Sequence, residues 1–537
     1  MRRLSPGIFW SRSKSNEASR ALVRCNVPIS TTNTNTNTNT NTNTNTNTNT
    51  NTNTTTHGVH LTEDIYDAVI VGAGMVGAAV AALLGTNRLT SQLRVAVVDV
   101  KPQPTRFRPS AVPDLRVSTV TPGSIELLRR AGAWDDIRPP LAASFANMQV
   151  WDSSSRGYIR WDARDTGAEQ MGIVVENTLL QAALLAAAER NGRNTELIWP
   201  AEIRSLRLPY DGPAAGPSDS TGIDSDGGGE GGGFKPPHGL AELVLGNGRV
   251  LATRLVVAAD GAASRVRQMA GLRTWGWGYG QRGLVATVST AEPSETAWQR
   301  FLPTGPLALL PVRDGYSNVV WSTTPQTATA MEAMSSAAFA AAVNKALRDT
   351  SIPNTPGTLT SLLGPMAAFL ERLGPFAEFG RNSGSGSGSG SNGFQDPPMV
   401  LGWAGGPPRS FPLQMKQAGR YILPRLALVG DAAHAVHPLA GQGVNLGFGD
   451  AGVLVEALAG AVETGADPGD ARILQEDYEA PRRRAVLTMV AALDGIKRVF
   501  EVQDPGFATL RGVGLSLVNA TGPVRNGLMQ YAMLGQA

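Results

Sequence analysis

Cysteine is almost absent from this chain of 537 residues: the only one is Cys25, close to the N-terminus. One cysteine in that place excludes a disulfide framework, a thiolate nucleophile and an iron–sulfur cluster in the folded part. Long apolar runs are lacking as well. None approaches the roughly 18–20 residues of a membrane-spanning helix, so we expect any membrane contact to be peripheral.

Without its N-terminal region, the chain also lacks an excess of positive or negative charge. The whole chain has 47 basic and 44 acidic residues. Six of the basic residues and one of the acidic residues lie within residues 1–56. The remainder therefore has 41 basic and 43 acidic residues and a net charge of −2. This balance gives no electrostatic case for a nucleic-acid partner.

The N-terminal region has its own composition. Residues 1–30 combine six basic residues with several serines and one acid, Glu17, which is typical of a mitochondrial or plastid transit peptide. Residues 31–60 are largely an Asn-Thr repeat, and we predict a disordered linker there. A disordered arm without a targeting role is the alternative.

The rest of the chain alternates short apolar strands with helical patterns, which predicts an α/β fold with a parallel sheet. Three strands without intervening helices follow within residues 283–322, and they predict an antiparallel sheet in a second domain. Stretches rich in Gly and Ser predict surface insertions at residues 209–239 and 381–396. From Ala471 onward the tail is predicted to be helical, with breaks at Pro481, Gly495 and Pro505.

A glycine-rich turn follows the first predicted strand. Gly72, Gly74 and Gly77 form a GxGxxG pattern between this strand and an Ala/Leu helix. Asp99 ends the next strand, where a ribose-binding acid belongs. Asp99 would repel a 2′-phosphate, which argues against NADP, but the pattern does not separate NAD from FAD.

A second glycine-containing segment lies far downstream. An apolar strand runs into Gly430 and Asp431, and a turn with Gly441 and Gly443 opens a helix at about Val444. In this arrangement the Asp431 carboxylate could accept a hydrogen bond from a ribose hydroxyl. The unpaired N–H groups at the start of the helix would face a ligand that lies beyond Gly443. Two such turns predict one large cofactor held between them.

Two weaker signals accompany these segments. Asp260 and Gly261 end another apolar strand; alone they would be an ordinary turn, and beside the other two segments they indicate a third cofactor contact. His434 and His437 could face one metal ion. No third ligand is evident and Pro438 follows directly, so we expect the histidines to shape the turn and predict no metal site.

Together these segments resemble the three signatures of the class A flavoprotein aromatic monooxygenases. Residues 437–450 (HPLAGQGVNLGFGD) are similar to the signature of the ubiquinone-biosynthesis hydroxylase family. The resemblance spans about residues 64–535, and the transit-like leader is closest to the mitochondrial members. Further matching segments are residues 115–120, 172–177, 410–413 and 478–484.

The resemblance implies an α/β fold: a Rossmann-like FAD-binding domain of the para-hydroxybenzoate hydroxylase type with an inserted antiparallel-sheet substrate domain and a helical tail. The FAD-binding domain is expected at residues 61–145, 171–275 and 420–470. The substrate domain is expected at residues 146–170 and 276–419, and the helical region at 471–537.

The resemblance also implies residue roles. Gly72, Gly74 and Gly77 would hold the FAD pyrophosphate, and Asp99 the adenosine ribose. The other expected cofactor contacts are Arg116, Asn177, Asp260, Gly261, Gly430, Asp431, Gln442 and Asn445.

Pro438, Gly441 and Gly443 would line the oxygen-facing side of the flavin, with the helix N-terminus near N1 and the C2 carbonyl. No side-chain nucleophile is required there. The implied activity is hydroxylation at C5 of a 4-hydroxy-3-polyprenylbenzoate ring through a flavin C4a-hydroperoxide. Electrons would come from ferredoxin and its reductase or from NAD(P)H.

The implied location is the matrix face of the mitochondrial inner membrane, as a peripheral protein in a complex of ubiquinone-synthesis proteins. Three alternatives stay open. Another class A monooxygenase would act on a different aromatic substrate. A flavin halogenase would need a Trp-x-Trp-x-Ile-Pro element, whereas Gly278 and Tyr279 follow Trp275 and Trp277 here. A prenyl-binding module on the same fold would lack a complete flavin site.

Overall fold

The computed structural model describes residues 65–104, 107–155, 157–209, 239–349, 393–438 and 441–534. The predicted transit peptide (residues 1–30) and Asn-Thr linker (31–60) lie outside these residues. Most of the two predicted insertions, 209–239 and 381–396, also lies outside them.

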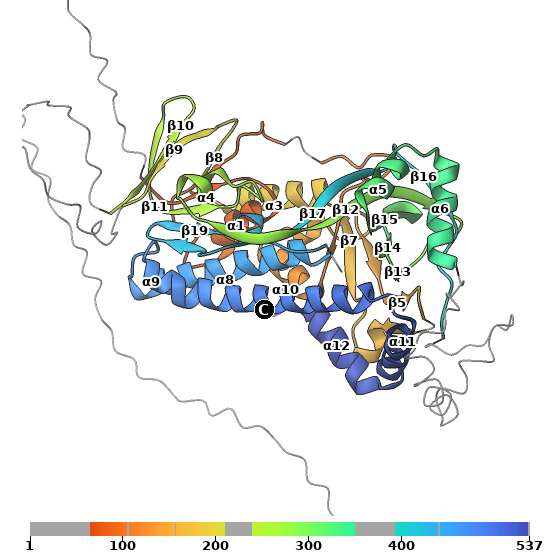
Figure 1. The fold of residues 1–537 in the computed structure, drawn as a ribbon. Coiled ribbons are helices and arrows are strands. Elements are labelled where there is room, and N and C mark those ends of the chain that lie inside the picture. The colour runs from red at the N-terminus through yellow and green to blue at the C-terminus, as the bar shows by residue number, and fades with distance from the viewer. Residues whose placement is uncertain are drawn as a thin grey trace, which may run out of the picture. The chain divides into compact units, whose positions relative to one another are not determined.

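A parallel sheet carries the first part of the fold (Figure 1). Its order is β18 (Ile422–Leu423), β19 (Leu426–Leu428), β11 (Val250–Ala258), β1 (Ile65–Val71), β2 (Val95–Val98) and β8 (Thr195–Ile198), with β10 (Ala241–Leu245) beside β11 and β9 (Ile203–Arg207) beside β10. The strands from β19 to β8 run parallel. Their near-continuous Val, Ile, Leu and Ala sequences reflect burial on both faces, and Val69 and Ile70 are 0% exposed.

Helices rich in small residues pack with this sheet. α1 (Met75–Thr86) contacts both α3 (Asn177–Asn191) and α8 (Gln442–Thr464), and α2 (Pro122–Arg130) packs against α8. Seven of the twelve residues of α1 are Gly, Ala or Thr, which allows its backbone to lie close to its neighbours. α8 begins at Gln442, two residues before the predicted start at Val444.

The expectation that no apolar run is long enough to cross a membrane is wrong for α8. Its segment Gly443–Thr464 is long and apolar enough, but 67% of the apolar stretch is buried within the protein. Phe448, Leu454 and Val455 belong to the main hydrophobic core. α8 is therefore a core helix of this domain.

The second sheet confirms the predicted antiparallel architecture. Its order is β20 (His434–Ala435), β17 (Arg409–Ala418), β12 (Thr274–Thr290), β15 (Tyr316–Thr323), β14 (Gly305–Pro311), β13 (Thr296–Leu302), β5 (Asn147–Asp152) and β6 (Tyr158–Asp162), with β16 (Val400–Trp403) beside β12. All neighbours are antiparallel except β13 and β5. α5 (Pro325–Glu332) and α6 (Ser336–Arg348) share a buried core with this sheet.

A small third sheet joins β3 (Val117–Val120), β7 (Gly172–Glu176) and β4 (Ala143–Phe145). The boundaries of the predicted domains stay a prediction, and β20 crosses them, because it lies in the segment assigned to FAD binding yet pairs with β17 of the second sheet. Short 3₁₀ helices occupy Trp134–Asp136, Ala163–Thr166, Arg313–Gly315 and Gly430–Ala432.

The C-terminal region is helical, as predicted. It comprises α9 (Ala471–Leu474), a π-helical turn (Gln475–Glu479), α10 (Ala480–Glu501), α11 (Pro505–Ala520) and α12 (Gly522–Leu534). Pro505 starts α11, but the predicted break at Pro481 is wrong, because the helical segments continue without interruption from Ala471 to Glu501. The predicted break at Gly495 is wrong: this residue lies inside α10, where one glycine costs only about 1 kcal/mol relative to alanine.

A buried ion pair fixes this region to the second sheet. The Arg511 guanidinium lies 2.8 Å from the carboxylate of Asp152 at the end of β5, and both side chains are 2% exposed. Arg511 also donates to the carbonyls of Val499 and Val502 at the end of α10. One side chain thus joins α10, α11 and the sheet.

We predict that Arg511→Met lowers the free energy of unfolding by about 3–5 kcal/mol, because it leaves Asp152 charged and buried without its partner. Arg498→Met is the control, since Arg498 forms an ion pair with Asp494 at a side-chain exposure of 74%; it should cost less than about 1 kcal/mol. Urea unfolding curves of both variants measure the difference. Equal midpoints would contradict the structural role given to Arg511.

Candidate functional site

The predicted cofactor residues meet at one edge of the parallel sheet. β1, β2, β11 and β19 run in the same direction, so the residues that follow them share this edge. These residues are Gly72, Asp99, Asp260 and Gly430. The carboxyl edge of an open α/β sheet is where such folds bind their ligands.

The turn after β1 requires glycine at two positions. Gly72 has a φ of +103°, and a Cβ there would lie 2.4 Å from the Ala259 carbonyl oxygen. A Cβ on Gly77 would lie 1.9 Å from the Gly72 carbonyl oxygen. Gly74, by contrast, has no atom within 4 Å of its Cβ position, so the backbone beside the start of α1 is open to a ligand.

Asp99 joins the glycine turn to the end of β2. Its carboxylate accepts hydrogen bonds from the backbone N–H groups of Ala73 (2.7 Å) and Lys101 (2.8 Å). The side chain therefore lies beside the turn, as the spacing predicts. It holds the turn in place in addition to the ribose contact expected of it.

Asp260 caps a short helix and keeps one oxygen unsatisfied. Its Oδ2 accepts from the Val266 N–H (3.1 Å) at the start of α4 (Arg265–Met269). Its Oδ1 is buried without a hydrogen-bond partner. Because buried polar atoms normally have a hydrogen-bond partner, we expect Asp260 Oδ1 to accept from a ligand hydroxyl or an ordered water. Gly261 beside it has a φ of +83° and open space at its Cβ position.

Arg116 and Asn177 lie side by side although 61 positions separate them in the sequence. The Asn177 N–H donates to the Arg116 carbonyl (3.0 Å), and Asn177 Oδ1 accepts from the Ser118 hydroxyl (2.7 Å). A cavity of about 850 Å³ adjoins them, lined by Asp114, Glu176, Thr178 and Gln181 among others. Its volume suits a large ligand.

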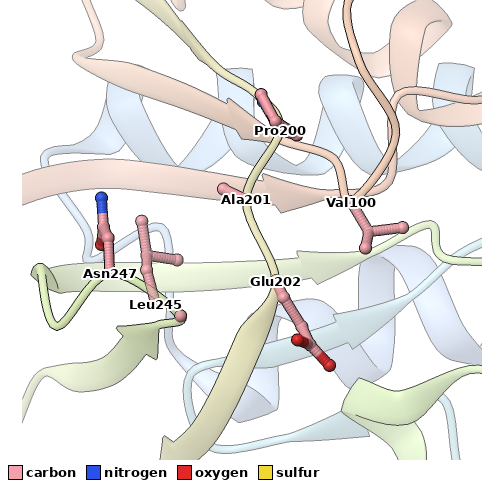
Figure 2. A pocket seen from close by; sticks show the side chains of 7 residues that line it. Val100, Pro200, Ala201, Glu202, Leu245 and Asn247 are labelled. Carbon is pink, nitrogen blue, oxygen red and sulfur yellow. The ribbon is translucent and has the colours of Figure 1, made fainter.

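A smaller cavity, of about 260 Å³, lies where residues after β2 and β8 approach the end of β10 (Figure 2). Val100, Ala201 and Asn247 are among its lining residues. The Ala201 N–H donates to the Asp99 carbonyl (2.7 Å), so the backbone of Asp99 is joined to one of the lining residues.

The second glycine segment leaves the Asp431 side chain exposed. Desolvation by the surrounding protein, with a further contribution from Asp450, nevertheless raises the pKa of the Asp431 carboxyl. The carboxylate is therefore reachable from solvent and at the same time partly desolvated by neighbouring groups. The preceding residue, Gly430, donates its N–H to Asp450 (2.9 Å).

The two histidines have separate environments. His434 Nε2 lies 2.6 Å from Asp450 Oδ2. His437 is 1% exposed and meets the Tyr279 ring edge to face at 4.8 Å between centroids. Among the described residues no group of three or more possible ligands could hold a metal ion.

The start of α8 is shaped by Gly441 and Asn445. Gly441 has a φ of +64° and precedes the helix, and its Cβ position lies 3.0 Å from the Thr119 side chain. Asn445 donates to the carbonyls of Thr119 (2.9 Å) and Gly441 (3.1 Å) and accepts from the Thr121 N–H (3.1 Å). These bonds hold the Asn445 amide group against the turn, so Asn445 positions the turn; its direct contact with the cofactor stays a prediction.

The turn itself has open space where the cofactor is expected. Gly443 has no atom within 4 Å of its Cβ position. Pro438 accepts from the Gly441 N–H (3.2 Å) across the turn, and Gln442 begins α8. Open backbone at Gly74 and Gly443, the unsatisfied Asp260 oxygen and the accessible Asp431 fit an extended dinucleotide along the sheet edge.

Comparison with known proteins agrees with this geometry. The model of the family "FAD binding domain" matches residues 407–492. The mitochondrial ubiquinone biosynthesis monooxygenase COQ6 of Xenopus tropicalis is 37% identical over 477 residues, covering 87% of this chain and 93% of that protein. The human COQ6 is 34% identical over 482 residues, with 88% and 93% covered.

The chain belongs to the COQ6 family of ubiquinone biosynthesis monooxygenases. It is an FAD-dependent monooxygenase of a mitochondrial family, and it uses dioxygen and a reductant on an aromatic substrate. The fold is shared with p-nitrophenol 4-monooxygenase PnpA from Pseudomonas putida DLL-E4, at a TM-score of 0.58 and 18% identity over 88% of this chain and all of that one.

The COQ6-type site contains residues that the sequence patterns did not single out. A Cβ on Gly447 would lie 2.5 Å from the Val76 side chain and 3.6 Å from Gly430 Cα, so α8, α1 and the Gly430 turn meet there. Asp450 and Arg482 lie behind the same turn. GxxxG spacing from Gly443 to Gly447 was the available signal for the close helix contact.

We predict opposite effects for two alanine substitutions in α8. Gly447→Ala should lower the free energy of unfolding by about 1–3 kcal/mol, because the stiff Val76 side chain must move. Gly460→Ala should leave stability unchanged or raise it by up to about 1 kcal/mol, because no atom lies within 4 Å of that Cβ position. Thermal unfolding of both variants checks this contrast, and similar changes in the two would show that Gly447 is not a point of close packing.

A pH effect follows from His437. Burial, with a smaller contribution from Lys497, lowers the pKa of His437 from its ordinary value near 6.5 to about 4, while Asp494 acts in the opposite direction. Between these values the unfolded chain binds more protons, so stability should fall on acidification, by up to about 1.4 kcal/mol per pH unit. His437→Gln should flatten this dependence between pH 6.5 and 4 in unfolding experiments. A slope unchanged by the substitution would assign the pH effect to other groups.

Proposed function

We propose that the enzyme hydroxylates C5 of the 4-hydroxy-3-polyprenylbenzoate ring in ubiquinone synthesis. The observation that supports this most is the convergence of distant chain segments, from Gly72 to Gly443, on one sheet edge beside an antiparallel sheet. Relatives that are 34–37% identical over nearly their whole length bear the name of ubiquinone biosynthesis monooxygenases. Ring position is inferred from the resemblance to the mitochondrial members.

In this proposal FAD lies along the sheet edge with its adenosine near Asp99. Gly72, Gly74 and Gly77 allow its pyrophosphate to approach the start of α1. Asp431 accepts a hydrogen bond from the ribityl chain, a contact that also offsets the desolvation of its carboxylate. The flavin ring then faces Pro438 and the first turn of α8.

Bound FAD supplies the activation of dioxygen and the transfer of one oxygen atom. The residues around it supply position and a site protected from water. Backbone N–H groups at the start of α8 direct positive partial charge toward the ring. Because its pKa is near 4, His437 is neutral at physiological pH and adds no charge beside Pro438.

The substrate's 4-hydroxyl activates the neighbouring ring carbon for attack, so no protein nucleophile is needed. The polyprenyl tail is apolar, which favours a peripheral position on the matrix face of the mitochondrial inner membrane. We further propose ferredoxin with its reductase, or alternatively NAD(P)H, as electron donor, and association with other ubiquinone-synthesis proteins. The charge of the chain after residue 56 favours no nucleic-acid partner.

Lipid analysis of cells that lack their own family member tests this function. Expression of this chain should restore ubiquinone, and the Asp431→Ala and Gly441→Asp variants should lose bound flavin and restore little of it. These cells should instead accumulate a prenylated ring without the C5 hydroxyl. Gly460→Ala serves as the control on the same helix and should restore ubiquinone fully.

Three outcomes would contradict the proposal. Normal ubiquinone in cells without the protein would remove the pathway assignment. Accumulation of a ring that already has its C5 hydroxyl would place the enzyme at another step. Purified holoenzyme that hydroxylates a different aromatic compound in preference to a short-chain prenylated 4-hydroxybenzoate, with ferredoxin or NADPH as donor, would change the substrate.

A further inference from the structure

A fully buried network of side chains lies behind the turn that carries Asp431. Its centre is Asp450 on α8, which is 0% exposed. Asp450 Oδ2 lies 2.6 Å from His434 Nε2 and accepts the Gly430 N–H at 2.9 Å. Asp450 Oδ1 accepts from Arg482 Nε on α10 at 2.8 Å.

The network contains a buried ion pair, and removing either partner would leave the other charge without its counterion. Burial alone would raise the pKa of Asp450, but His434 and Arg482 outweigh it and lower this pKa below its ordinary value. The carboxylate is therefore charged. Arg482, at 3% exposure, is its buried counterion, and a carboxylate left without one in this place would be strongly destabilised.

α8 leaves space for the Arg482 guanidinium beside its backbone. A Cβ on Gly449 would lie 2.7 Å from Arg482 Nη2. The same Nη2 donates to the Leu446 carbonyl at 3.0 Å. Arg482 thus reaches Asp450 across a gap that only a glycine at position 449 leaves open.

The network fixes both ends of one short segment. Gly430 stands immediately before Asp431, and His434 stands three residues after it and pairs with Gln417 of β17. Because Gly430 and His434 both bond to a single carboxylate oxygen, the position of Asp450 determines where Asp431 lies. Asp450 in turn is held by a residue of the C-terminal helices.

We propose that Asp450 and Arg482 are positioning residues for the flavin: they hold the Gly430–His434 segment in the conformation that binds FAD. The inference rests on the proposed contact of Asp431 with the cofactor. It means that α10, which carries none of the expected FAD contacts, sets FAD affinity and the environment of the bound ring.

The first test is FAD binding by Arg482→Met. The apoprotein is prepared and its fold checked by far-UV circular dichroism, and FAD is then titrated while flavin fluorescence is recorded. We expect the dissociation constant to rise roughly 10- to 100-fold, the range found when groups that orient a ligand-binding residue are removed. Arg484→Met is the matched control on the same helix, where Arg484 is exposed, and it should change the constant less than about twofold.

A second variant separates positioning from stability. Asp450→Asn combined with Arg482→Met removes both charges, so the apoprotein should regain most of the stability lost in the single variant. FAD affinity should stay weak, and the visible circular dichroism of bound flavin should differ from that of the wild type. This variant also provides the measurement if Arg482→Met alone does not fold.

Wild-type affinity and an unchanged flavin spectrum in the double variant would overturn the inference, because the network would then serve stability alone. So would unchanged affinity in a folded Arg482→Met protein. Neither result depends on the substrate. Failure of the C5-hydroxylase proposal would appear as a wrong product from wild-type holoenzyme, whereas failure here would appear as unaltered FAD binding.

Discussion

The site depends on close contacts among the ends of β1 and β11, α1 and α8 at the carboxyl edge of the parallel sheet. Gly72 lies against the carbonyl of Ala259, Gly77 lies against Gly72, and Gly447 brings α8 against Val76. Side chains at these glycines would overlap their neighbours by 1 Å or more in the tightest contacts. Strand β1, helix α1 and helix α8 therefore form one rigid unit, and the open space for a ligand lies beside it, at Gly74 and Gly443.

Around this unit, buried charges join parts of the chain that are distant in sequence. Glu176 at the end of β7 accepts from the Asp114 N–H (2.6 Å) and pairs with Arg313 (2.6 Å), which comes from the second sheet. The segment before Arg116 is thereby attached to the third sheet and to the turn between β14 and β15 of the second sheet. Arg511 and Arg482 act in the same way for the C-terminal helices. Each pair needs its partner to avoid a buried unpaired charge, so the pairs specify which segments meet.

Local patterns in the sequence were sufficient to predict the elements whose structure depends on residues close together in the chain. Gly72, Gly74, Gly77 and Asp99 were located correctly at the sheet edge because a strand, a glycine turn and a second parallel strand constrain one another. The cofactor contact expected of Asn445 stays a prediction, whereas the bonds of its amide to Thr119, Thr121 and Gly441 could not be read from the sequence. Gly447, Asp450 and Arg482 were missed, because their importance arises from contacts between helices that no window of sequence contains. The apolar length of α8 was missed for another reason: its many glycines and alanines hide a continuous core helix.

The charges near the expected flavin ring are largely compensated. Asp450 is neutralised by Arg482, His437 is uncharged near neutral pH, and the Lys497 ammonium lies 5.1 Å from the centroid of the Tyr279 ring and also pairs with Glu501. Compensated side chains contribute little net field at the turn. In the proposed arrangement, the oriented N–H groups at the start of α8 would then be the main fixed source of positive potential. Such a source does not titrate, so in the proposed arrangement it would favour negative charge on a bound flavin without offering a proton to it.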